Sequence, residues 1–244
     1  MSTAALLWRQ FRFERRLFWR NPSAAFFNFL LPLLFLVLIA SAYGSGNEQL
    51  EVLVPGIAGM AIMATTFTAL AFNITFLREG GVLKRVRGTP LPPGAYFGGL
   101  LLNSVVNAVL QILLVILIGH FLYDAAWPRD WASLAVFGAL GVVCFGALGI
   151  ALSHAIPNFD SAPAYTNAVF LPLIFISGVF YSADDLPTVL LTIAEVLPLK
   201  HVIDGLAGAI VDGAGVTDHL TALAVVGAWA AAGVFLAVRY FRWE

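Results

Sequence analysis

The sequence predicts an all-α integral membrane protein with six transmembrane helices. Hydrophobic residues make up 60% of its 244 residues and charged residues only 11%, whereas soluble domains carry roughly a quarter charged residues. A helix needs about 20 apolar residues to cross a bilayer core of about 30 Å. Six stretches meet or approach that length, and residues 1–244 read as a single transmembrane domain. The stretches are residues 24–43, 52–77, 96–122, 131–151, 163–180 and 220–238.

Residues 1–22 precede the first span and are predicted to form an amphipathic helix in the membrane interface. Four arginines recur at helical spacing on one side, and four apolar residues recur on the other, as in helices that lie on a membrane surface. The arginines are Arg9, Arg12, Arg16 and Arg20, and the apolar residues are Ala4, Leu7, Phe11 and Phe18. From the residues alone, such a helix can be a simple anchor that sets the topology of the chain.

The basic residues orient the spans, because lysines and arginines collect on the cytosolic side of a membrane. With the N-terminus inside, the inner segments hold eleven of the thirteen Lys and Arg residues, and the outer segments hold two, Arg129 and Lys200. The inner ones are Arg9, Arg12, Arg15, Arg16, Arg20, Arg78, Lys84, Arg85, Arg87, Arg239 and Arg242. Six spans with both termini cytosolic fit this count, and we expect a bacterial or archaeal cytoplasmic membrane. The acids placed outside are Glu48, Glu51, Asp124, Asp130, Asp184, Asp185, Glu195, Asp204, Asp212 and Asp218.

Residues 78–95 interrupt the apolar sequence between the second and third spans. Basic residues there are followed by TPLPP, which cannot continue a helix because proline lacks an N–H and disfavours helical geometry in the residue before it. We interpret the segment as a short basic helix across the cytosolic surface, followed by a proline stop. An element of this form is suited to receiving a push from a soluble partner. Its lone acid, Glu79, is expected to pair with nearby arginines.

Two spans carry patterns of polar or small residues. In the third, Asn103, Asn107 and Gln111 recur every four residues, so one helix face is expected to point into the protein or a wet cavity. Hydrogen bonding between helices that only stabilises the fold is the alternative. In the fourth, GALG occurs at residues 138–141 and again at 146–149. These small residues indicate close packing inside the subunit, with a dimer seam as the alternative.

Residues 184–215 are half apolar and lie between the fifth and sixth spans. Pro198 separates two apolar helices of about a dozen residues, which are too short to span a bilayer of about 30 Å and too apolar for a free loop. We predict that they form re-entrant helices on the outer side.

Two stretches resemble a known family. REGGVLKRVRGTPLPP looks like the cytosolic coupling segment of ABC exporter permeases of the type-2 class. FISGVFYSADDLPTVLLTIAEVLPLKHVIDGLAGAI is similar to the end of their fifth span and their outer re-entrant helices. The residues that carry this second match are Gly178, Val179, Phe180, Tyr181, Leu186, Pro187, Pro198, Leu199, His201 and Asp204.

The resemblance implies one permease half of an ATP-driven exporter, paired in lipid with a second half that is expected to be the same chain. A separate ABC ATPase subunit would carry the ATP and Mg²⁺. In this reading residues 1–22 are the connecting helix, with Arg9, Arg12, Arg16 and Arg20. The residues that couple to the ATPase would be Glu79, Lys84, Arg85, Arg87, Pro90, Pro92 and Pro93.

The resemblance also implies a central cavity lined by the second and fifth spans, to which the amides of the third could add. The residues assigned to this substrate path are Phe67, Phe72, Asn73, Asn103, Asn107, Thr166, Asn167 and Phe170. An uncharged, aromatic lining favours a hydrophobic or amphipathic drug-like molecule or lipid. A polysaccharide or glycolipid on stacking aromatics is the alternative, and the same residues could instead only pack the dimer.

The chain has no motif for nucleotide or metal chemistry. It lacks G-x-x-x-x-G-K-[ST], so it has no phosphate cradle of its own, and its histidines have no ligand spacing with one another or with Cys144. We expect a transport subunit that is not itself an enzyme and holds no metal, cofactor or nucleic acid. A proton-driven secondary transporter would need an acid or similar relay within a span, and an intramembrane enzyme would need buried His, Asp or Glu. The middles of the six spans contain no Asp, Glu, Lys or Arg.

Overall fold

The computed structural model describes residues 2–182 and 186–240. Asp184, Asp185 and Arg242, which the charge pattern assigned to the two sides of the membrane, lie outside the described residues. The elements, in chain order, are α1 (Thr3–Arg20), α2 (Pro22–Tyr43), α3 (Gln49–Met63), η1 (Ala64–Thr68), α4 (Ala69–Glu79), α5 (Val82–Arg87), α6 (Pro93–Tyr123), α7 (Trp131–Ser153), η2 (Phe159–Ser161), α8 (Ala162–Ile176), α9 (Thr188–Ala194), α10 (Pro198–Ala207), η4 (Gly208–Asp212), η5 (Val216–His219) and α11 (Leu220–Tyr240).

The all-α membrane fold is confirmed. Within the described part of the chain, five helices are long and apolar enough to cross a membrane, and Asn28–Tyr43 is a shorter apolar helix. The five are Gln49–Glu79, Pro93–Tyr123, Trp131–Ser153, Phe159–Ile176 and Val216–Arg239. Together with the shorter helix they fall on the six predicted stretches. The second span is continuous through α3, η1 and α4, with one π-helical turn at its centre.

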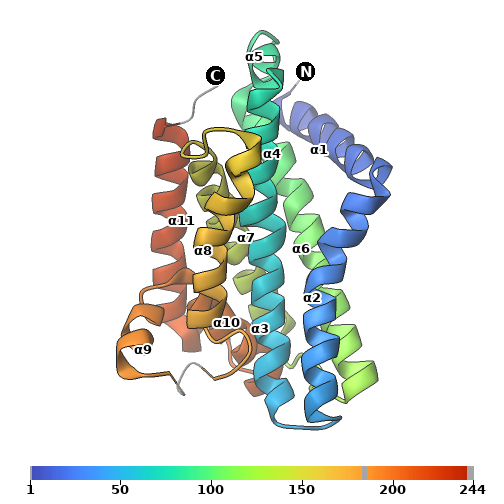
Figure 1. Cartoon of the computed structure of the whole chain (residues 1–244), viewed down its shortest axis with the longest axis vertical. Coiled ribbons are helices and arrows are strands. Elements are labelled where there is room, and N and C mark those ends of the chain that lie inside the picture. Colours follow the sequence, from blue (N-terminus) through green and yellow to red (C-terminus); the bar gives the residue numbers. More distant parts are fainter. Residues whose placement is uncertain (1, 183–185, 241–244) are drawn as a thin grey trace.

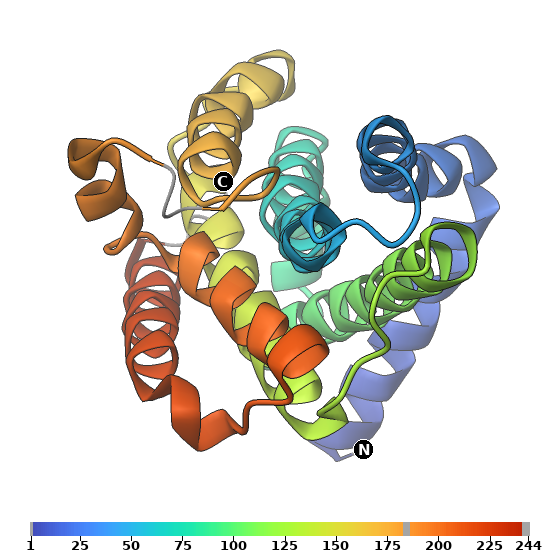
Figure 2. The ribbon, with the colours of Figure 1, turned by 90° about the horizontal axis from the view of Figure 1, so that it is seen from below.

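The helices form a bundle with two distinct ends (Figure 1). The start of α1, the end of α11 and the whole of α5 gather at one end, while α9, α10 and the connection from α2 to α3 lie at the other. Because the start of α1 and the end of α11 lie at the same end of the bundle, the arrangement agrees with an even number of spans. α10 packs inward against α3, α7 and α11 (Figure 2), and the re-entrant character of α9 and α10 remains a prediction.

The glycines of α7 let neighbouring helices approach closely inside the subunit. A Cβ built on Gly149 would lie 2.4 Å from the carbonyl oxygen of Phe67, and one on Gly146 would lie 2.7 Å from a methyl of Leu101. Gly141 faces Val202 of α10 at 3.2 Å. The prediction that the two GALG sequences pack within the subunit is therefore confirmed, because only hydrogen fits at the closest of these contacts.

Candidate functional site: a projecting basic helix and two cavities

The segment between the second and third spans has the predicted order of basic helix, proline stop and membrane helix. Gly81 enters α5 with φ of 67°, a left-handed conformation that glycine adopts without steric cost. Leu83 is fully buried against Leu70, Ile74, Tyr96 and Leu100. The helix α5 is thus held on the ends of α4 and α6 by one apolar side, and its polar side is left outward.

The predicted coupling residues occupy that outer side. Lys84, Arg85, Arg87 and Pro90 are exposed, and Pro92 is half-buried where it precedes α6. Nη2 of Arg85 donates to the carbonyl oxygen of Gly80 at 3.1 Å, which ties the guanidinium back over the glycine turn. The remaining predicted members of this set are Pro93, which is exposed at the start of α6, and Glu79.

Arg78 and Glu79 join the end of α4 to the connection between α7 and α8. Nη1 of Arg78 donates to the carbonyl oxygen of Ser153 at 2.8 Å, and its Nη2 donates to that of Ile156. Oε2 of Glu79 accepts from the backbone N–H of Phe159 at 2.6 Å. The sequence predicted arginine partners for Glu79, whereas the structure gives it a backbone amide 80 residues further along the chain.

The helix α1 packs along α6 through the predicted apolar side. A Cβ on Gly98 would lie 2.8 Å from Leu7, and one on Gly99 would lie 2.5 Å from Gln10. The four arginines of the predicted connecting helix, Arg9, Arg12, Arg16 and Arg20, are exposed. Exposed aromatic and aliphatic residues flank them, namely Trp8, Phe13, Leu17 and Trp19.

One cavity, of about 420 Å³, lies among α1, α2, the second span and α6, toward the α5 end of the bundle. We call it the amide cavity. It brings together four residues of the predicted substrate path, from two different spans: Phe72, Asn73, Asn103 and Asn107. The other lining residues are Phe18, Asn21, Asn28, Thr65, Ala69, Leu70, Phe76, Leu100, Ser104 and Phe159.

Arg15 of α1 binds two of the amides that line this cavity. Its Nη1 donates to Oδ1 of Asn103 at 3.4 Å and to Oδ1 of Asn107. The guanidinium also lies over the rings of Phe18 and Trp19, with Cζ 5.7 and 5.5 Å from their centroids. Gln111, one helical turn beyond Asn107, donates from Nε2 to the carbonyl oxygen of Phe29 in α2 at 3.1 Å. The polar face of α6 is therefore turned inward, as predicted.

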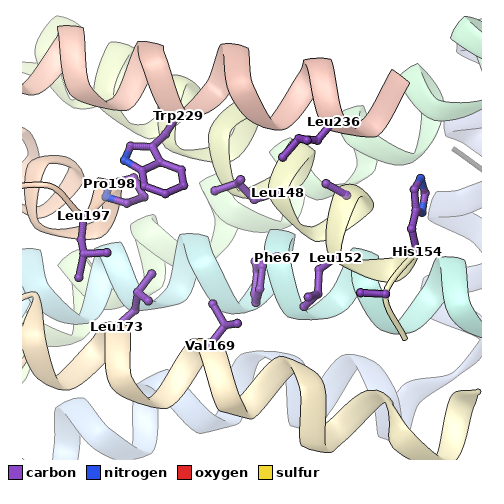
Figure 3. Close-up of a pocket in the computed structure, with 12 residues that line it drawn as sticks. Phe67, Leu148, Leu152, His154, Val169, Leu173, Leu197, Pro198, Trp229 and Leu236 are labelled. Atoms are coloured by element: carbon purple, nitrogen blue, oxygen red, sulfur yellow. The ribbon is translucent and has the colours of Figure 1, made fainter. Parts of the chain in front are cut away.

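A second cavity, of about 600 Å³, lies on the opposite side of the second span, among α7, α8 and α11 (Figure 3). We call it the apolar cavity. Phe67 from the π-helical turn points toward it, opposite Trp229 of α11, with Val169 and Leu173 of α8 along one wall. Nε1 of Trp229 donates to the carbonyl oxygen of Val196 at 2.7 Å. His154 is the one ionisable residue among the described residues that line it.

The structure does not bring the predicted substrate path into one cavity. Phe67 lines the apolar cavity, whereas Phe72 and Asn73 line the amide cavity. On α8, Thr166 is buried and donates to the carbonyl oxygen of Ala162 at 2.8 Å, and Phe170 is buried in the main core. Asn167 is exposed on the outer side of α8. Within one chain, the second span thus lies between two cavities, and Asn167 lines neither of them.

The contacts of Arg15 and Arg78 and the π-helical turn were not predicted from the sequence. Arg15 does not lie on the helix face shared by Arg9, Arg12 and Arg16. This offset was the one sign in the sequence that Arg15 has another role. The π turn has a partial signal in its threonines: Thr65 donates to the carbonyl oxygen of Ala61 and Thr66 to that of Ile62, at 2.8 and 2.6 Å. Such turns are frequent at functional sites, and this one supplies Thr65 to the amide cavity and Phe67 to the apolar cavity.

The fold and these cavities define a helical membrane protein with several spans. The sequence profile of the ABC-2 type transporter family matches residues 1–211, and the chain belongs to that family. It is 27% identical over 187 residues to a daunorubicin resistance ABC transporter permease protein of Streptomyces coeruleorubidus, covering 70% of this chain and 63% of the relative. It is 26% identical over 176 residues to a linearmycin resistance permease protein of Bacillus subtilis, covering 71% and 46%.

A third relative is not named for resistance. Nodulation protein J of Sinorhizobium fredii is 27% identical over 175 residues, covering 69% of this chain and 65% of the relative. The matched region thus spans less than two thirds of the length of each of these curated relatives. Drug resistance appears in the names of two of them.

Proposed function

We propose that this chain is the permease half of an ATP-driven exporter that moves a hydrophobic or amphipathic compound out of the cell. A separate ABC ATPase subunit would supply the energy, and a second copy of this chain would complete the pore. The observation that carries the proposal is the helix α5, which projects at one end of the bundle (Figure 1) with its basic side exposed and Leu83 fully buried beneath it. Membership of the ABC-2 type transporter family supports the same assignment.

The ATPase would dock on the outer side of α5 and on the four exposed arginines of α1. Basic side chains on a rim steer and orient an oppositely charged partner more than they add affinity. Buried Leu83 makes α5 a rigid extension of α4 and α6, so that a displacement of α5 reaches both spans. This arrangement is suited to converting a movement of a soluble subunit into a movement of membrane helices.

The substrate class follows from the two cavities and from the relatives. The apolar cavity is lined by aliphatic and aromatic side chains, and the amide cavity adds hydrogen-bonding groups. Such a combination suits a compound with a large apolar part and a few polar groups. Two relatives are named for resistance to daunorubicin and linearmycin, which supports a drug-like or lipid-like substrate for this chain.

A polysaccharide or glycolipid exporter of the same class is the second candidate. The phenylalanines beside the amide cavity could stack on sugar rings, and this observation favours the second candidate. A proton-driven carrier has less support, because a proton relay within a membrane uses a chain of Asp, Glu or His side chains. The described residues that line the two cavities include no Asp or Glu, and His154 is the one histidine among them.

The coupling assignment is tested by reversing charge on α5. The double variant Arg85→Glu with Arg87→Glu should insert normally, bind the ATPase subunit at least about tenfold more weakly, and lose substrate-stimulated ATP turnover, because both exposed cations become anions. Co-purification with the tagged ATPase and ATP turnover in liposomes measure these effects. Arg129→Glu, an exposed residue at the opposite end of the bundle, is the control and should leave both unchanged. Normal stimulated turnover in the α5 variant would refute the docking site.

A further inference from the structure

One hydrogen-bond donor at the amide cavity has no partner among the described residues. Nδ2 of Asn28 is buried there and has no hydrogen-bond partner. A buried amide N–H without a partner costs roughly 1–3 kcal/mol, so a site that keeps one is suited to a ligand that supplies an acceptor.

Arg15 fixes the direction in which two further amides can bond. A guanidinium has only donors, so the atoms of Asn103 and Asn107 that it contacts are their Oδ1 oxygens. With those oxygens engaged, the groups that each amide still offers include two N–H donors on Nδ2. Asn107 is 5% exposed, so its amide has little access to water. Asn28, Asn103 and Asn107 therefore supply three NH2 groups among the residues that line one cavity.

Positive charge adjoins the cavity, and the residues that line it include no carboxylate. The charge is that of Arg15, whose side chain bonds directly to two lining amides. The neighbouring acid in sequence, Glu14, instead accepts at Oε1 from Nε2 of Gln10 on its own helix at 2.7 Å. Excess donors beside a cation favour an anionic group rich in acceptor oxygens.

The other side of the cavity is aromatic. The ring of Phe159 lies edge-on to those of Phe72 and Phe76, with centroids 6.4 and 5.4 Å apart, and Phe18 closes the side next to α1. A volume of about 420 Å³ can enclose a small polar headgroup and the first part of an apolar chain.

We propose that the amide cavity binds the phosphate-bearing headgroup of an amphiphile, with Asn28, Asn103 and Asn107 donating to the phosphate oxygens and Arg15 holding two of these amides in register. The amphiphile is either a compound that the transporter carries or a lipid that stays bound to it. In the first case the site rests on the proposed function and names the class of its substrate. The tail lies against the phenylalanines.

The test uses the full chain, purified in an uncharged maltoside detergent and titrated with dodecyl phosphate in a calorimeter. Saturable binding is expected, about tenfold tighter than that of dodecanol, which has the same tail without the anionic acceptors; a hydrogen bond to a charged group corresponds to about that factor. Equal affinities for the two compounds in the folded parent would overturn the proposal, and this comparison needs no variant.

Matched variants assign the binding to this cavity. Asn28→Leu and Asn107→Leu keep the number and branching of the side-chain heavy atoms but remove the donors, and each should weaken binding of dodecyl phosphate about tenfold. Asn47→Leu, in the exposed connection from α2 to α3, should not. Arg15→Lys should weaken it as well, because an ammonium cannot hold both amide oxygens in a planar fork. If Asn28→Leu, Asn107→Leu and Asn47→Leu bind like the parent, the phosphate lies elsewhere and the proposal is wrong.

Two further measurements identify the source of the ligand. One phospholipid per chain, retained through purification and lost in Asn107→Leu, would assign the cavity to a bound lipid. Stimulation of ATP turnover by dodecyl phosphate in the assembled complex would assign it to a substrate. Binding to the chain alone does not depend on the ATPase, so failure of the complex to form would refute the proposed function and leave this site standing. Equal affinities for dodecyl phosphate and dodecanol would refute this site and leave the proposed function standing.

Discussion

Oε2 of Glu79 accepts a hydrogen bond from the backbone N–H of Phe159 at 2.6 Å. Arg78 donates hydrogen bonds to the carbonyl oxygens of Ser153 and Ile156. Together, Arg78 and Glu79 connect the end of α4 to the start of the fifth span. These hydrogen bonds lie just before the glycine turn at Gly81. If α5 has the coupling role proposed above, these bonds would carry a displacement of α5 and α4 on to α8.

Removing this acceptor should uncouple the two spans. In Glu79→Ala the N–H of Phe159 loses its partner, and we expect substrate-stimulated ATP turnover in the complex to fall about threefold to tenfold, since a hydrogen bond to a charged group contributes about 1.5–3 kcal/mol and this one is exposed. Glu79→Gln keeps an acceptor oxygen and should lose less. Glu48→Ala, an exposed acid at the other end of the bundle, is the control. Equal turnover in the alanine and glutamine variants would show that the hydrogen bond is not used.

The glycines of α7 give a matched pair for stability. A Cβ at Gly149 would lie 2.4 Å from the carbonyl oxygen of Phe67, whereas one at Gly138 would lie 3.5 Å from Ile112. Gly149→Ala should destabilise the fold by about 1–3 kcal/mol through overpacking, and Gly138→Ala should be neutral or slightly stabilising because alanine favours the helix. Thermal unfolding of the two purified variants measures the difference. Equal unfolding temperatures would mean that α7 is less closely packed than the structure has it.

Glu14 predicts a pH dependence. Burial raises the pKa of this carboxyl above its ordinary value of 4.5, and the hydrogen bond from Gln10 lowers it in part. Because the folded pKa is the higher one, the stability gained from the neutral form is complete below pH 4.5 and is lost as the pH rises through the folded pKa. Glu14→Gln should thus unfold a few degrees higher than the parent at pH 8, with the difference vanishing toward pH 4. A constant difference across that range would exclude ionisation of Glu14 as its cause.

The two ends of the bundle predict opposite accessibility across the membrane. Asn47 and Thr217 are exposed at the end away from α5, and Lys84 is exposed on α5 itself. Single cysteines at Asn47 and Thr217 should react with an impermeant maleimide from outside, and one at Lys84 only after the inner face is opened. Cys144 is buried and serves as the unreactive background. Labelling of the Lys84 site in intact cells would invert the assigned orientation.

Elements with a strong local signal could be predicted from the sequence, and contacts between distant segments could not. The proline stop before α6 and the inward packing of Gly146 and Gly149 follow from the chemistry of single residues. The bond from Arg15 to Asn107 joins residues 92 apart in the chain, and no periodicity encodes it. The rotation of α8 was also hidden, because a helix that is apolar all round has no hydrophobic face to orient it. The sequence therefore could not show that Thr166 is buried and Asn167 exposed.

Phe67 and Asn107 line two different cavities, and this difference leads to the last prediction, which concerns the substrate path. If transported compounds occupy the apolar cavity, Phe67→Ala should change substrate-stimulated ATP turnover or the resistance profile severalfold, since a large aromatic wall is lost from a cavity of about 600 Å³. Asn167→Ala should change the same readouts only if the exposed side of α8 faces a pore formed with a second copy of the chain. Leu122→Ala, exposed near the far end of α6, is the control and should change neither. A panel of hydrophobic compounds exported normally by both variants, but altered by Asn103→Leu or Asn107→Leu, would place the path along the amide cavity instead.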